Sequence, residues 1–168
     1  MTTTTKRRTT QHRPYVTSYE PAVQHGILLR IGNACMRAIL RTRLGERMQG
    51  LSILSFTGRK TGIRYHVPVA VIDPDGSPIV LTAAGWRVNL RGGADVEVRA
   101  GRRNRRMRAT LVEDPERVVE VYERMLPIVG ATHSKRLGLV LAGDRLPTHE
   151  ELLEGIEGRR FLITLADR

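Results

Sequence analysis

The sequence predicts a mainly β protein of the α+β class, in which an antiparallel barrel is flanked by helices. Short apolar segments recur between residues 51 and 112, and turns rich in Gly, Pro and Asp separate them. Helical periodicity lies outside this region, near the start of the chain and after residue 114. The 168 residues are enough for one domain with a substantial core.

The first part of the chain divides into a tail and a helix. Residues 1–18 are rich in Thr and Arg and lack periodicity, so we expect a disordered basic tail, followed by a single domain over residues 19–168. Pro21 is well placed to open an amphipathic helix that runs to about Arg43. Such a helix, with arginines on its polar face, can lie on an anionic membrane surface or pack on its own domain, and the second is favoured.

Leu51–Val71 predicts the hairpin around which the chain is organised. The apolar residues of 51–56 are typical of a buried strand, and Val67, Val69 and Val71 alternate as in a second strand. Between them lies the turn Thr57–Gly62, with the sequence TGRKTG. Its glycines allow backbone N–H groups to converge on an oxyanion, and its cations add charge, although a solvated hairpin tip has the same composition.

Three more strands and a short helix follow this hairpin. The turn at residues 73–76 leads into a strand over 78–83, and residues 85–90 (GWRVNL) predict a short helix or irregular turn. A second hairpin is expected from residues 96–99 and 105–112. In it Val96, Val98, Met107, Ala109 and Leu111 share one face. Arg99, Arg106 and Arg108 therefore point the other way.

The last third of the chain predicts two helices and a closing strand. Asp114 and Pro115 are suited to the N-cap and first position of a helix that runs to about Leu126. Residues 135–141 fit a short strand or helix, residues 149–157 an acidic helix, and residues 160–165 a final strand.

The net charge of +11 points to an acidic partner. Residues 1–110 carry 20 cations and 6 anions, whereas residues 111–168 carry 8 and 11. Phosphate, polycarboxylate, anionic lipid and nucleic acid all fit. The basic stretch 102–108 lacks interleaved aromatic residues, however, so it supports no specific nucleic-acid recognition.

Composition also indicates a compartment and excludes several chemistries. The single Cys35 excludes an internal disulfide and favours a reducing, cytoplasmic location, since no apolar signal core or spanning segment is visible. The five histidines have no metal-ligand spacing, and neither a GxSxG elbow nor a GxGxxG or Walker sequence occurs. An anion site without an evident acid, base or nucleophile suggests that a bound cofactor supplies the chemistry.

Two segments at this spacing resemble the deazaflavin-dependent nitroreductase family, split β-barrel proteins that use coenzyme F420. They are TGRKTG at residues 57–62, followed by Pro68, and WRVNL at residues 86–90 before a Gly-rich turn and a Val-x-Val strand. The resemblance extends from about residue 27 to residue 165 and implies a split antiparallel β-barrel with flanking helices.

The resemblance also implies a coenzyme site. The turn would hold the phosphate and acidic tail of F420, residues 64–69 would run along the coenzyme, and the tryptophan segment would flank the deazaflavin ring. The positions concerned are Arg59, Lys60, Thr61, Arg64, Tyr65, His66, Pro68, Val69, Trp86 and Asn89. No catalytic side chain and no metal ligand is implied.

The function expected on these grounds is hydride transfer from reduced F420 to a quinone-like or other conjugated small-molecule acceptor. The alternative is a non-catalytic protein of the same fold that binds F420 or a flavin such as FMN. Two features keep that alternative open: the short segment Thr82–Gly85 before the tryptophan, and Ala70 where some family members have a tyrosine. Peripheral contact with the inner face of the cell membrane and the oligomeric state are also left open.

Overall fold

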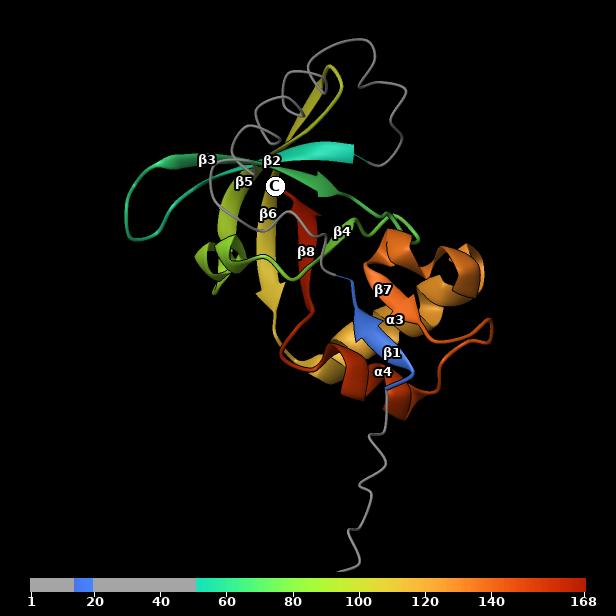
Figure 1. The fold of residues 1–168 in the computed structure, drawn as a ribbon. Helices are drawn as coiled ribbons and strands as arrows, with labels where there is room; N and C mark the ends of the chain where they lie inside the picture. Colours follow the sequence, from blue (N-terminus) through green and yellow to red (C-terminus); the bar gives the residue numbers. More distant parts are fainter. Residues whose placement is uncertain (1–13, 20–50) are drawn as a thin grey trace, which may run out of the picture.

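The computed structural model of the chain describes residues 14–19 and 51–168. A six-stranded antiparallel sheet dominates it, with the strand order β3-β2-β5-β6-β8-β4 (Figure 1). Its strands are β2 (Leu51–Thr57), β3 (Arg64–Ala70), β4 (Ile79–Thr82), β5 (Ala94–Ala100), β6 (Arg103–Val112) and β8 (Phe161–Asp167). The predicted mainly β class is confirmed.

The sheet curls so that its two edge strands approach each other. Ile72, just after β3, and Ile79, the first residue of β4, form an isolated bridge. The Ile72 N–H donates to the Ile79 carbonyl at 2.9 Å, and the reverse bond is 2.7 Å long. β3 also contacts β4. The result is the curled half-barrel that the family resemblance implies.

The remaining elements, apart from η1, form a second layer beside the half-barrel (Figure 1). The helices are α3 (Pro115–Val129) and α4 (His149–Ile156), and the 3₁₀ helices are η1 (Gly85–Leu90) and η2 (Ala131–Leu137). A two-stranded sheet pairs β1 (Val16–Ser18) with β7 (Leu139–Leu141). Helix α3 begins where its cap Asp114 predicts, and α4 lies within the helix predicted over residues 149–157, with Thr148 as its N-cap.

Strand β8 separates two apolar cores because its side chains alternate. Phe161, Ile163 and Leu165 face the interior of the half-barrel, where Leu54, Leu90 and other apolar residues pack. Leu162 faces the opposite way, into a core built mainly from α3, α4, β1 and β7. β4 alternates in the same way, with Val80 in the first core and Ile79 in the second, so β8 and β4 both join the half-barrel to the helical layer.

Two predicted boundaries need correction. The expected tail over residues 1–18 is too long, because Val16–Ser18 pair antiparallel with Leu139–Leu141 and Val16 is fully buried. The second strand of the organising hairpin begins at Arg64, three residues before Val67, because the pairing with β2 continues up to the turn. The amphipathic helix predicted from Pro21 to Arg43 lies outside the described residues.

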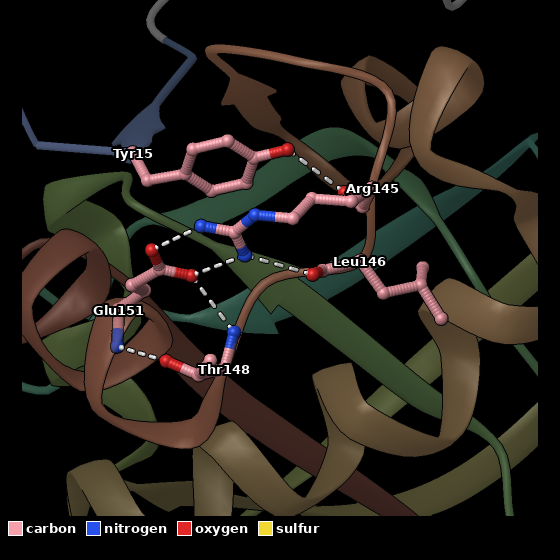
Figure 2. Close-up of polar contacts among 5 residues, drawn as sticks. All are labelled: Tyr15, Arg145, Leu146, Thr148 and Glu151. Atoms are coloured by element: carbon pink, nitrogen blue, oxygen red, sulfur yellow. Dashed lines mark hydrogen bonds and ion pairs between the residues drawn. The ribbon is translucent and has the colours of Figure 1, made fainter.

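Tyr15 also anchors this N-terminal segment to the loop before α4 (Figure 2). Its hydroxyl donates to the Arg145 carbonyl at 2.9 Å, and the Arg145 guanidinium lies 3.9 Å from its ring centroid. Arg145 also holds Glu151 through two bonds of 2.5 and 2.8 Å, which together with the Thr148 N–H lower the Glu151 pKa to about 2. These contacts fix the start of α4 against Tyr15, just before β1.

Candidate functional site

The structure joins the two segments that the sequence predicts to form one site. The main-chain N–H of Arg59, in the β2–β3 turn, donates to Oδ1 of Asn89 in η1 at 3.1 Å. The Arg59 guanidinium donates to the Arg91 carbonyl, just beyond η1, at 2.9 Å. Residues 30 positions apart in sequence are thus in direct contact, and η1 supports the turn from one side.

Glycine is required in the turn for two different reasons. The Gly58 N–H donates to the Ile63 carbonyl and the Gly62 N–H donates to the Gly58 carbonyl, which closes the turn. A Cβ on Gly58 would lie 2.6 Å from Tyr65 Cε2, and Gly62 has a φ of 65°. This tight backbone leaves Lys60 exposed at the tip.

An aromatic cluster lies between the turn and η1. The Phe56 ring stacks on Tyr65 with centroids 5.5 Å apart, and its centroid lies 5.6 Å from that of Trp86. Phe56 is buried, whereas Tyr65 is 37% exposed. Ile63 and Val88 nearby in the chain are also exposed apolar residues. An accessible apolar and aromatic surface therefore accompanies a cationic turn, which is a suitable combination for a flat heterocycle with an anionic tail.

The predicted contact residues of β3 divide between the two faces of the sheet. Val67 and Val69 face the barrel interior with Tyr65, and Val69 is only 6% exposed. Arg64, His66 and Pro68 alternate with them, so their side chains project to the outer face. Residues 64–69 cannot all present side chains to one ligand, and a contact from Val69 would have to come from its main chain.

The outer face of this sheet is an ion-pair network rather than a stripe of unpaired arginines. Arg64 pairs with Glu97 at 2.5 Å, and this contact is the main reason why the Glu97 pKa is lowered. Asp95 accepts Arg108 at 3.4 Å and Arg168 at 3.0 Å. The acids of β5 thus offset part of the positive charge that the sequence places here.

His66 also belongs to this outer face. Its Nδ1 lies 2.8 Å from Oγ of Ser55 on the paired strand. Ser55 is 7% exposed, so the contact satisfies a nearly buried hydroxyl. The two side chains stabilise the β2–β3 pairing next to the turn.

Three residues that shape the candidate site are not among those predicted from the sequence. Phe56 is apolar in an apolar strand, so nothing in the pattern distinguishes a core residue from the centre of an aromatic cluster. Arg91 contributes a main-chain carbonyl, which any residue could supply. Glu97 could have been anticipated, because an acid alternating with valines on a strand beside arginines suggests cross-strand ion pairs.

Within residues 14–19 and 51–168 no three His, Cys, Asp or Glu side chains are grouped as a metal site would require. No helix in the same ranges is long and apolar enough to cross a membrane.

These features define a split-barrel protein with a glycine-dependent cationic turn fixed against a tryptophan-bearing helix. The model of the F420H(2)-dependent quinone reductase family matches residues 28–133, more than half of the chain. The chain belongs to this family, which confirms the resemblance to deazaflavin-dependent reductases.

Several solved structures are similar to this chain. One is an F420-H2 dependent reductase (FDR-A), with 17% identity, a TM-score of 0.41, and coverage of 69% of this chain and 94% of that one. A domain-swapped dimer has 15% identity, a TM-score of 0.42 and coverages of 83% and 99%. Campylobacter jejuni ChuZ has 9% identity, a TM-score of 0.42 and coverages of 86% and 55%. No curated protein matches.

Proposed function

We propose that this protein is an F420-dependent oxidoreductase that reduces a quinone-like or other conjugated small molecule. Family membership supports an F420-dependent oxidoreductase. The main observation behind the proposal is the hydrogen bond from the Arg59 N–H to Asn89. This bond connects the cationic turn with η1. Without this contact the two motifs would be separate surface features.

The described residues fit the coenzyme in charge and in shape. Lys60 and Thr61 lie exposed at a turn of closely packed backbone, as binding of a phosphate or an acidic tail requires. Tyr65 and Trp86 flank the buried Phe56 and supply an aromatic wall. When bound, reduced F420 supplies the hydride.

The chain's own contribution is to position the coenzyme and to keep water from the ring. Arg59 and Asn89 hold the turn against η1, so in this proposal they position the turn as well as line the site. Arg64 lies on the outer face with His66 and Pro68, and we assign it to the tail of the coenzyme rather than to the ring. Rigid placement of these groups favours hydride transfer because it reduces the entropy cost of aligning two reactants.

A binding protein without turnover is the second candidate. Ala70 ends β3 and is exposed, so the position offers no hydroxyl to an acceptor. The short segment Thr82–Gly85 connects β4 directly to η1 and leaves little chain to cover a ring. FMN is the corresponding alternative ligand, since its phosphate and ring have the same general chemistry.

One experiment separates these candidates. The purified full chain is titrated in parallel with F420, FMN and FAD while the absorbance of each is followed. Reduced F420 is then mixed with the protein and a soluble quinone. Saturable F420 binding with sustained oxidation of F420H2 supports the enzyme, whereas binding alone supports the binding protein. Tighter binding of FMN than of F420 would overturn the cofactor assignment.

We also propose that the domain predicted over residues 19–168, extended at its start to include β1, acts as one unit. We propose further that the protein works in the cytoplasm, where its single cysteine stays reduced. Contact with the inner face of the membrane is proposed only as a peripheral one, through basic residues.

A further inference from the structure

A buried arginine lies away from the proposed coenzyme site. Arg160 immediately precedes β8 and is only 8% exposed. It lines a pocket where the end of β3 meets β4 and η2, together with Ala70 and Ile72. Arg64 and Ala70 are the two ends of β3, so the pocket lies about 20 Å from the β2–β3 turn, at about 3.3 Å per residue. It is therefore a separate place on the molecule.

The guanidinium of Arg160 donates hydrogen bonds to main-chain carbonyls, but no anionic group among the described residues neutralises its charge. Its Nη2 donates to the carbonyls of Tyr19, at 2.6 Å, and of Gly138. Its Nε is buried and has no hydrogen-bond partner. No carboxylate among residues 14–19 and 51–168 forms an ion pair with it. Because an arginine stays protonated and a buried charge is costly unless paired, this position favours an anion from outside the described chain.

The backbone is shaped to admit this guanidinium. Gly138 has a φ of 77°, and a Cβ there would lie 2.5 Å from both Cζ and Nη1 of Arg160. A side chain at this position would occupy the space that the guanidinium fills. The close approach therefore depends on glycine, and the charge is held beneath the surface instead of extending into solvent.

Two more cations lie at the mouth of the same pocket. Lys135 and Arg136 come from the last turn of η2, and both are exposed. The apolar side chains of Ile72, Leu81 and Leu137 form part of the wall, and the described lining contains no Asp or Glu. Three positive charges around a partly apolar hollow are complementary to an oxyanion on a small apolar body.

We propose that the Arg160 pocket binds a small oxyanion, either a carboxylate or a phosphate. Arg160 would supply a preorganised charge at the base, and Lys135 and Arg136 would close over the anion. This proposal does not depend on the identity of the coenzyme, because no residue that lines the pocket is among those assigned to the coenzyme.

The test uses thermal unfolding and isothermal titration calorimetry of the full chain. The probes are inorganic phosphate and benzoate, each compared with sodium chloride at equal ionic strength. The site variant is K135Q/R136Q, whose residues are exposed and should not affect folding. The matched control is R102Q/R103Q, which removes the same charge from the β5–β6 turn.

We expect at least one probe to raise the Tm saturably in the wild type and in the control. At the Arg160 pocket the site variant should bind that probe at least tenfold more weakly than the wild type and the control do. Stabilisation by benzoate alone would identify a carboxylate ligand, and stabilisation by phosphate alone a phosphate ligand. Equal effects on the site variant and the control, or no effect of either probe on the wild type, would overturn the proposal. Because K60Q alters only the β2–β3 turn, where phosphate could also bind, the difference between the site variant and the control should persist in a K60Q background.

Discussion

Asn89 uses both ends of its side-chain amide to connect the β2–β3 turn with η1. Its Oδ1 accepts the Arg59 N–H at 3.1 Å, and its Nδ2 donates to the Trp86 carbonyl at 2.8 Å. One side chain therefore fixes the turn relative to the tryptophan. The next residue, Leu90, is fully buried in the half-barrel core. Asn89 therefore contributes to the candidate site, whereas its neighbour Leu90 contributes to the folded core.

Replacing each of these neighbours by Ala should produce opposite results. N89A should weaken F420 binding severalfold and change the Tm little, because it removes two partly exposed hydrogen bonds that position the turn. L90A should lose about 2–5 kcal/mol of unfolding free energy, since it leaves a cavity in a packed core. Thermal unfolding and a coenzyme titration on both variants provide the check. A lower Tm for N89A than for L90A would contradict this assignment.

Lys60 should contribute to coenzyme affinity and hardly at all to stability. The side chain is exposed at the tip of the turn, so K60Q should leave the Tm within error of the wild type. Loss of a charge-assisted contact should weaken F420 binding by about 1.5–3 kcal/mol. R102Q removes one charge from another exposed turn and should bind as the wild type does. Equal weakening by the two substitutions would mean that net charge, and not the turn, attracts the coenzyme.

The core strands could be predicted from sequence because local alternation determines which side chains are buried. Val96, Met107 and Ala109 lie on the buried face of the β5–β6 hairpin, as their spacing predicts. The short helix over residues 85–90 and both capped helices could also be predicted from sequence, since each has a local signal in its turn or cap. The β2–β3 turn that we propose as part of the coenzyme site was identifiable from its glycines and cations.

Contacts between distant segments could not be predicted in this way. Val16–Ser18 is too short to show periodicity, and its partner strand begins more than 120 residues later. Arg160 gave no signal either, because burial of an arginine depends on carbonyls supplied by Tyr19 and Gly138. A cross-strand ion pair of Glu97 could be anticipated, but its partner Arg64, like the Arg108 partner of Asp95, follows only from the strand register, which sequence patterns leave undetermined.

The contact of His149 with α3 should make stability depend on pH. His149 lies 3.0 Å from Glu123 and 2.9 Å from Glu116, and hydrogen bonding to Glu123 is the main cause of its raised pKa. A raised pKa means that the folded state binds the proton more tightly. The stabilisation is therefore complete below the ordinary histidine pKa of about 6.5 and is lost as pH rises through the folded value.

The Tm difference between wild type and H149Q should accordingly be larger at pH 5.5 than at pH 9. H133Q is a suitable control, because His133 is exposed and its ring contacts the uncharged side chain of Thr132. A difference that stays constant across this range would show that the imidazolium does not contribute.

Gly155 should tolerate no side chain, because β1 packs directly on α4 at this position. A Cβ there would lie 2.6 Å from Cβ and Cγ1 of Val16 and 2.7 Å from its carbonyl oxygen. Ser18 also donates to the Gly155 carbonyl at 3.2 Å, so the strand cannot move away without losing a hydrogen bond. Helix propensity alone would favour Ala over Gly by about 1 kcal/mol. Overpacking typically costs about 1–3 kcal/mol, and here the obstacle includes backbone that cannot rotate aside.

The overpacking cost should exceed the propensity gain, so G155A should have a lower unfolding free energy than the wild type in urea. E154A, one residue earlier on the exposed side of α4, provides the comparison and should be close to neutral. An unchanged or higher stability for G155A would show that β1 does not lie against α4 in solution. In that case the boundary of the tail would return to residue 18, as the sequence alone predicts.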